Sequence, residues 1–271
     1  MTGNTSKIQI SSRTSTMIKF IHHGSRLDGS FSDDSDYEYR GIFIPMKDEI
    51  LLSEIPSVDH GITDGGYFNS IDWAANGVVP TMISYPLHTV LKGASEGKWN
   101  CIELLLAPWV AIEYSVKQEF IVDDIEPTDF ISNDFTQIMR MIDNMHDTFV
   151  RMWPNQDENL FKIDWGENEK LRKPLSIFVR HTLMALELYR TGGIKFPLAY
   201  SDMLKDVRLS NDAKDIVAIY EYAVRRRGDL AGMVNGDTSH AIGWGDAGRI
   251  DERIRNTIRD VYHEIVTGNW D

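Results

Sequence analysis

The residues best suited to chemistry lie in one short segment near the N-terminus. A Gly-Ser pair, Gly24 and Ser25, is followed by two carboxylates, Asp36 and Glu38. A glycine lets the backbone approach a phosphate closely, and a serine offers a hydroxyl and an amide hydrogen as donors. Two carboxylates side by side repel each other unless a cation lies between them, and Mg²⁺ prefers such ligands together with substrate phosphates. The segment therefore predicts a site for a polyphosphate complexed with Mg²⁺.

Two neighbouring strands must position these residues. An apolar stretch over 17–22 predicts the first strand, which ends just before Gly24, and residues 36–45 predict the second. Side chains at i and i+2 of a strand point to the same face, so Asp36 and Glu38 are expected to share one face of the sheet. Three further elements are expected next: a strand over 78–85, a short helix over 86–93 and a buried, more helical segment over 101–109.

The second half of the chain has the periodicity of helices. Apolar residues recur there at a spacing of three to four, which marks the buried face of a helix. An acidic stretch over 122–127 is the expected boundary between an N-terminal domain, 1–122, and a helical domain, 123–271. We therefore expect an α+β fold, with a small mixed β-sheet domain followed by helices over 135–153, 175–189, 212–226 and 250–266.

The helix expected over 212–226 leads directly into a cationic triplet, Arg225, Arg226 and Arg227. Cations suit the C-terminal end of a helix because they interact favourably with its dipole. The following residues, 228–248, are rich in Gly and Asp and predict a long loop.

Charge and cysteine content narrow the classes of partner. The chain has 271 residues, a formal net charge of −13 and one cysteine, Cys101. The acidic balance argues against duplex DNA as a partner, because affinity for phosphate backbones depends on Lys and Arg. A lone cysteine forms no intramolecular disulfide and no Cys-based zinc site, so Cys101 is expected to be a buried thiol. No stretch approaches the roughly 18 apolar residues of a membrane span, and the N-terminus does not have the pattern of a signal peptide, so we expect a cytoplasmic protein.

The segment around the candidate residues also resembles a known superfamily. Gly-Ser-Arg-Leu-x-Gly over 24–29, followed by Ser-Asp-Tyr-Glu-Tyr-Arg-Gly-Ile-Phe over 35–43, is similar to the DNA polymerase β-type nucleotidyltransferases. Within them it resembles the predicted nucleotidyltransferases of bacteria and large phages. A Lys-Gly…Glu-Leu-Leu-Leu-Ala-Pro segment over 92–108 fits the same group, and the resemblance continues more sparsely to about residue 228.

The resemblance implies an enzyme that moves a nucleoside monophosphate from a nucleoside triphosphate to an acceptor hydroxyl and releases pyrophosphate, with Mg²⁺ as the metal. It leaves the acceptor open between a small molecule, a protein side chain and an RNA end, and a phage origin would place the protein in the host cytoplasm. Six residues receive roles: Asp36 and Glu38 as catalytic metal ligands, and Gly24, Ser25, Arg26 and Ser35 as nucleotide-binding residues.

One departure from the superfamily pattern opens an alternative function. Many members carry a third carboxylate on a following strand, where it helps to deprotonate the attacking hydroxyl, and this position falls near Thr81. Asp72 or Glu103 could substitute for it. Without a third acid, the chain could keep the fold as a catalytically weak or inactive nucleotide-binding or interaction protein. A third hypothesis, an RNA-binding module built on the helical domain, is disfavoured by the acidic composition.

Several other polar residues have both a functional and a structural interpretation. A buried acid needs a partner, so a charged residue within an apolar run is either ion-paired or catalytic. Arg26 is either a phosphate contact or an exposed turn residue, and His22 and His23 form either a base or metal site or a structural pair. Glu103 is either a catalytic acid or the partner of a core arginine in an ion pair. Arg180 and His181 either line the cleft or have packing roles.

Overall fold

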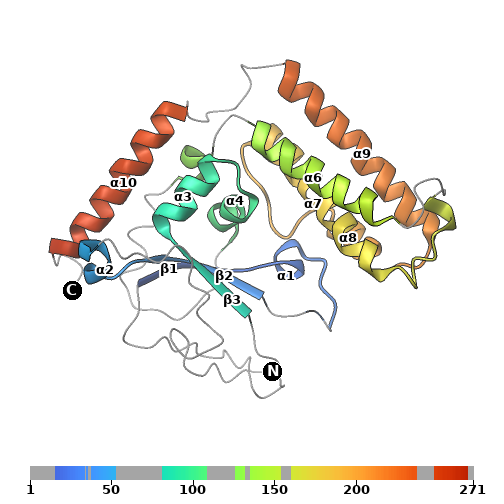
Figure 1. The fold of residues 1–271 in the computed structure, drawn as a ribbon, viewed down its shortest axis with the longest axis horizontal. Helices are drawn as coiled ribbons and strands as arrows, with labels where there is room; N and C mark the ends of the chain where they lie inside the picture. Colours follow the sequence, from blue (N-terminus) through green and yellow to red (C-terminus); the bar gives the residue numbers. More distant parts are fainter. Residues whose placement is uncertain are drawn as a thin grey trace.

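The computed structural model of the chain combines a small sheet with many helices, and the α+β class predicted from the sequence is confirmed (Figure 1). The structure describes residues 16–33, 35, 38–52, 81–108, 126–131, 135–153, 160–236 and 247–267.

The sheet has three strands, β1 (Thr16–His22), β2 (Glu38–Ile44) and β3 (Thr81–Pro86), in the order β1-β2-β3. β1 and β2 run antiparallel, whereas β2 and β3 run parallel, so the sheet is mixed as predicted. β-branched and aromatic residues favour these strands because they pack well on a pleated surface. The parallel register places Glu38, the first residue of β2, opposite Thr81.

Two helices, α3 (Leu87–Ser95) and α4 (Trp99–Leu106), lie on one face of the sheet (Figure 1). Their close packing depends on Gly93, because a Cβ atom at this position would clash with the Sγ atom of Cys101. Cys101 is buried as predicted, and burial raises the pKa of its thiol to about 11. Lys19 on β1 joins the layers, since its Nζ atom donates a hydrogen bond to the Leu105 carbonyl oxygen at 2.6 Å.

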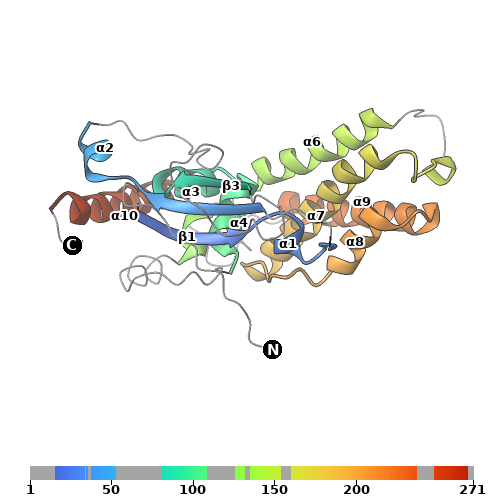
Figure 2. The same ribbon diagram turned by 90° about the horizontal axis from the view of Figure 1, so that it is seen from below.

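Four helices form a second body beside one end of the sheet (Figure 2). They are α6 (Thr136–Met152), α7 (Glu169–Thr191), α8 (Ser201–Leu209) and α9 (Ala213–Gly236). α7 is central: it packs against α6, α8 and α9 and is buried along most of its length. It extends beyond the predicted range of 175–189 at both ends and stops before Gly192, whose left-handed conformation (φ 76°) suits a helix C-cap.

The predicted end of α9 is wrong. The helix continues past Arg225–Arg227 to Gly236, so the first nine residues of the predicted loop over 228–248 are helical, and residues 237–246 lie outside the described residues. The three cations therefore lie inside the helix and not at its end. Neighbouring acids pair with them, as in the 2.7 Å contact between Arg227 and Asp143. The buried face also continues through Leu230.

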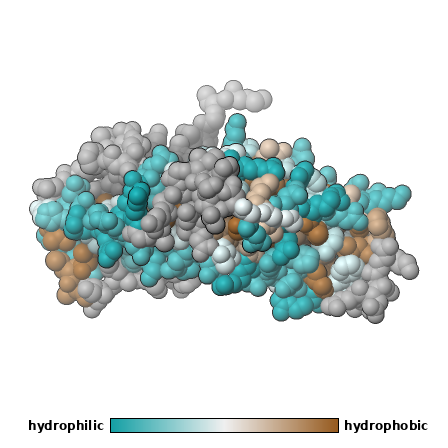
Figure 3. Space-filling view, turned by 90° about the horizontal axis from the view of Figure 1, so that it is seen from above, coloured by the Kyte–Doolittle hydropathy of each residue, from teal (hydrophilic) through white to brown (hydrophobic). Residues whose placement is uncertain are grey.

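Two helices were not predicted from the sequence, α2 (Lys47–Leu52) and α8. α2 buries none of its residues, so it has no apolar stripe to reveal it. Its Leu51 and Leu52 are 58% and 65% exposed, and Figure 3 shows a hydrophobic patch at the end of the molecule where α2 lies.

The last helix, α10 (Ala247–Thr267), does not join the helical body. It packs against α2, α3 and the short 3₁₀ helix η2 (Pro127–Phe130), as Figure 1 shows at the left of the sheet. A hydrogen bond of 2.9 Å between the Tyr262 hydroxyl and His88 Nδ1 fixes this contact. The predicted domain boundary near residue 122 lies outside the described residues, and the division of the chain there stays a prediction. None of the described helices is both long and apolar enough to cross a membrane.

Candidate functional site

A cavity of about 600 Å³ lies between the end of the sheet and helices α7 and α8. Four of the predicted site residues line it: Gly24, Ser25, Ser35 and Glu38. They come from the segment after β1, from the loop that precedes β2 and from the start of β2. The fold therefore brings three of the four predicted nucleotide-binding residues and one predicted metal ligand to one cavity.

The Gly-Ser pair is explained by the backbone. Gly24 has φ 63° and begins a single helical turn, α1 (Ser25–Asp28), whose Leu27 amide donates to the Gly24 carbonyl oxygen at 3.2 Å. A Cβ atom on Gly24 would lie 2.8 Å from Oε2 of Glu38. Glycine is therefore required twice, by the left-handed φ and by the approach of the carboxylate. The Gly24 backbone and the Glu38 carboxylate are in direct contact across the site.

The loop between α1 and β2 is held by polar contacts of its own. The Ser35 hydroxyl oxygen accepts a hydrogen bond of 2.9 Å from the Ser32 amide, and the Ser35 carbonyl oxygen accepts one of 2.9 Å from Nη2 of Arg26. The Arg26 guanidinium also lies over the Phe31 ring, 5.2 Å from its centroid. Arg26 is not among the residues that line the cavity, so the structure gives it a role in shaping the loop, and its direct contact with a nucleotide stays a prediction.

Of the predicted carboxylate pair, Glu38 is described and Asp36 lies outside the described residues. Glu38 is exposed at the start of β2, and no cation of the described residues lies within ion-pair distance of it. Its carboxylate is thus free to hold a metal ion, and it is a hard oxygen ligand of the kind that Mg²⁺ prefers. No cluster of three or more His, Cys, Asp or Glu side chains suited to a metal occurs in the described part of the chain.

The position of the missing third acid can be placed on the sheet. Thr81 is the register partner of Glu38 on β3, so the strand beside β2 has no carboxylate directly opposite Glu38. Of the two acids considered as substitutes, Asp72 lies outside the described residues. The other, Glu103 on α4, is 1% exposed and belongs to a buried ion-pair network.

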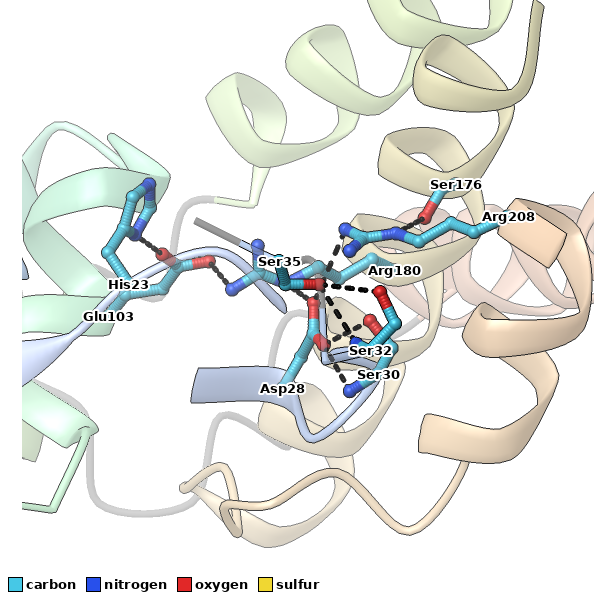
Figure 4. Close-up of polar contacts among 9 residues, drawn as sticks. All are labelled: His23, Asp28, Ser30, Ser32, Ser35, Glu103, Ser176, Arg180 and Arg208. Atoms are coloured by element: carbon cyan, nitrogen blue, oxygen red, sulfur yellow. Dashed lines mark hydrogen bonds and ion pairs between the residues drawn. The ribbon is translucent and has the colours of Figure 1, made fainter. Parts of the chain in front are cut away.

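Glu103 is held by two cationic or polar neighbours (Figure 4). Its Oε1 atom lies 2.9 Å from Nη2 of Arg180, and its Oε2 atom lies 3.5 Å from Nδ1 of His23. Burial alone would raise the pKa of Glu103, but Arg180 and His23 outweigh burial and lower the pKa to about 2. Glu103 is therefore ionised and paired, which confirms the ion pair with a core arginine and makes it a poor proton acceptor.

The same arginine joins α7 to the turn after β1. Arg180 Nε lies 3.4 Å from Oδ2 of Asp28, an acid with no exposed surface, and Arg208 Nη2 lies 4.0 Å from the same oxygen. The other Asp28 oxygen, Oδ1, accepts hydrogen bonds from the Ser30 amide at 2.9 Å and the Ser30 hydroxyl at 2.5 Å. Arg180 and Arg208 thus combine a place in the cavity wall with a fixed contact to the Gly-Ser turn (Figure 4).

The other histidines named from the sequence have packing roles. His181 is stacked on Trp99, with ring centroids 5.3 Å apart, and its burial, with smaller contributions from Arg180 and His23, lowers its pKa to about 4. His22 packs against Tyr39 at 5.0 Å, and burial followed by the charge of Arg26 lowers its pKa. Neither ring lines the cavity, whereas His23 does.

Two arginines that the sequence did not single out line opposite walls of the cavity. Arg172 on α7 donates five hydrogen bonds of 2.6–3.1 Å, to the carbonyl oxygens of Trp165, Arg208 and Ser210 and to the Asn211 side chain. In contrast, the Nε and Nη1 atoms of Arg40 on β2 are buried and have no hydrogen-bond partner among the described residues. Sequence spacing marks neither residue, because each depends on contacts with distant segments.

More cationic side chains than carboxylates line the cavity, although the chain is acidic. Among the described residues, five cationic side chains and two carboxylates line it: Arg40, Arg172, Lys173, Arg180, Arg208, Glu38 and Glu169. The formal net charge of the whole chain is −13. Cations gathered in a cleft focus the field there and attract anions. The arrangement suits a small anionic ligand such as a phosphate compound.

Comparison of the chain with models of protein families, with curated proteins and with solved structures found no match.

Proposed function

We propose that the protein is a Mg²⁺-dependent nucleotidyltransferase. It would move a nucleoside monophosphate from a nucleoside triphosphate to an acceptor hydroxyl and release pyrophosphate. The observation that carries the proposal is the cavity in which Gly24, Ser25 and Ser35 meet the free carboxylate of Glu38 among cationic side chains. A polyphosphate needs donors and positive charge, and its metal ion needs a hard oxygen ligand.

In this proposal, Glu38 and Asp36 hold Mg²⁺, which would offset the charge of the triphosphate and favour the departure of pyrophosphate. The Gly24 and Ser25 backbone and the Ser25 hydroxyl bind the β- and γ-phosphates. The acceptor hydroxyl loses its proton to solvent and its oxygen forms a bond to the α-phosphorus, while the bond from that phosphorus to the bridging oxygen breaks and pyrophosphate leaves with the electron pair. Positioning of the two reactants supplies much of the rate, as in other phosphoryl-group transfers.

The first test is calorimetric titration with each of the four ribonucleoside and four deoxynucleoside triphosphates, with Mg²⁺ and with EDTA. We expect one or more triphosphates to bind in a metal-dependent manner. Glu38→Gln and Asp36→Asn should each abolish this dependence, because each removes a charged metal ligand. Asp33→Asn is the matched control: Asp33 is exposed in the same loop and is not among the cavity-lining residues, so its removal should leave binding unchanged.

A triphosphate that binds would then be incubated with candidate acceptors, and release of pyrophosphate would be measured. If no triphosphate binds under either condition, the transferase proposal fails.

A catalytically weak or inactive nucleotide-binding protein is the second candidate. It is favoured by the register of Thr81 with Glu38 and by the pairing of Glu103 with Arg180, which together leave no obvious third acid among the described residues. This candidate predicts triphosphate binding without pyrophosphate release in the presence of any acceptor class, namely small hydroxyl compounds, proteins and RNA ends.

A further inference from the structure

We propose that Arg40 is a phosphate-binding residue of the cavity. Its ligand would be a phosphate group of the polyphosphate, and the identity of that polyphosphate as a nucleotide rests on the function proposed above. Arg40 lies in the middle of the sheet wall, on the central strand β2, and lines the same cavity as Glu38 and the Gly-Ser turn.

Among the described residues, none forms an ion pair or a hydrogen bond with the Arg40 guanidinium. Its register neighbours are Ile21 on β1 and Ile83 on β3, both apolar. The Nε and Nη1 atoms of its guanidinium are buried and make no hydrogen bond to any described residue. The side chain as a whole is half-buried, so the desolvation penalty falls on these two nitrogen atoms, whose hydration neither water nor a protein group replaces. An anionic ligand that enters the cavity would remove that penalty.

Glu38 and Arg40 together form a surface of mixed charge. Residues two apart on a strand point to the same face, about 7 Å apart along the strand. A carboxylate and a guanidinium so arranged suit a ligand that combines a cation with phosphate oxygens. Glu38 would hold the metal ion, and Arg40 would bind a phosphate oxygen directly. The planar guanidinium can offer two parallel N–H donors to a phosphate, which a lysine cannot.

The other arginines of the cavity are already engaged. Arg172 donates hydrogen bonds to the carbonyl oxygens of Ser210 and Trp165. Arg180 forms ion pairs with the buried acids Asp28 and Glu103. Arg208 donates to the Ser176 hydroxyl at 3.2 Å and lies near Asp28. Among the guanidinium groups that line the described part of the cavity, that of Arg40 is thus the one without an ion-pair or hydrogen-bond partner.

The test uses inorganic pyrophosphate as the probe and the full chain as the protein. Pyrophosphate affinity is measured by calorimetry, with and without Mg²⁺, for the wild type and for Arg40→Met, Arg40→Lys and Arg255→Met. Arg255 is the control, because it is an exposed arginine on α10 whose Nε atom donates only to the Asp251 carbonyl oxygen of its own helix. Melting temperatures without ligand are recorded for all four proteins.

We expect Arg40→Met to weaken pyrophosphate binding about tenfold or more, since a hydrogen bond to a charged group is lost. Arg40→Lys should fall between this variant and the wild type, and Arg255→Met should match the wild type. Without ligand, Arg40→Met should melt at the same temperature as the wild type or higher, because two buried nitrogen atoms without a partner are replaced by an apolar side chain of similar length. A structural arginine would give the opposite shift.

Two results would overturn the proposal. One is equal pyrophosphate affinity for the wild type and Arg40→Met, and the absence of any binding to the wild type at millimolar pyrophosphate counts as the same result. The other is a lower melting temperature of Arg40→Met together with an unchanged shift on adding pyrophosphate. If pyrophosphate binding depends on Arg40 but no triphosphate supports transfer, the transferase proposal fails and the assignment of Arg40 stands.

Discussion

The two walls of the cavity each hold an arginine, but only one of the two has its hydrogen bonds satisfied by the protein. On the helical wall, Arg172 is 6% exposed and its guanidinium donates to four acceptors, among them carbonyl oxygens near the end of α8. On the sheet wall, Arg40 lies between two isoleucines and has buried nitrogen atoms without a partner. An arginine therefore stabilises the fold on the helical wall, whereas on the sheet wall an arginine is available to bind a ligand. Residue type alone does not separate these roles, whereas hydrogen-bond satisfaction does.

The largest expected effect is on the helical wall. Arg172→Met should lower the free energy of unfolding by about 3–5 kcal/mol, because it leaves several buried carbonyl groups without donors. Urea denaturation of this variant beside Arg40→Met checks the contrast. A loss below about 1 kcal/mol for Arg172→Met would break the comparison between the walls.

The next effect concerns the ion pair of Glu103 with Arg180. The pKa of Glu103 is lowered from 4.5 to about 2, so its contribution to stability is present above pH 4.5 and is lost as the pH falls through about 2. Linkage makes this contribution about 3 kcal/mol at neutral pH. Glu103→Gln should lower stability by roughly that amount at pH 7 and should have a flatter stability profile between pH 4.5 and pH 2.

Urea midpoints measured across that pH interval test the prediction. Glu96→Gln is a suitable control, since Glu96 is an exposed acid that pairs with Lys98 at the surface near the same helix. Parallel pH profiles for the wild type and Glu103→Gln would contradict the assignment of Glu103 as a buried, ionised partner.

The smallest effect is expected from an exposed cation of the helical wall. Lys173 lines the cavity but is exposed, and exposed charge pairs contribute only about 0.2–1 kcal/mol. Lys173→Met should therefore weaken pyrophosphate binding by roughly two- to fivefold, and the difference should shrink at high salt because the interaction is screened. If Lys173→Met lost as much pyrophosphate affinity as Arg40→Met, the difference in exposure between Lys173 and Arg40 would not explain their contributions to binding.

Much of the fold could be predicted from the sequence where periodicity is local. Strand β1, the Gly-Ser turn and helices α6 and α7 follow from apolar spacing and from glycines at the turns. The C-terminal end of α9 could not, because Arg227 pairs with Asp143 on α6, a contact between distant residues that no local signal reveals.

The residues of the Gly-Ser and carboxylate motif could be predicted from the sequence, whereas the arginines that line the cavity around them could not. Gly24, Ser25, Ser35 and Glu38 meet in the cavity as expected, whereas Asp36 lies outside the described residues. Arg40 belongs to the same motif, yet only the register with Ile21 and Ile83 and its buried nitrogen atoms distinguish it from an ordinary strand residue. Long-range contacts decide which charges of an acidic chain remain available.

The packing of α10 against α2 and α3 has a consequence for biosynthesis. About 150 residues separate the end of α3 from the start of α10, and a ribosome adds roughly 5–20 residues each second. For on the order of ten seconds or more, the surface of α2 and α3 that α10 covers in the folded protein is therefore exposed. Until the last helix leaves the exit tunnel, the apolar surface that it covers is open to chaperones and to other nascent chains.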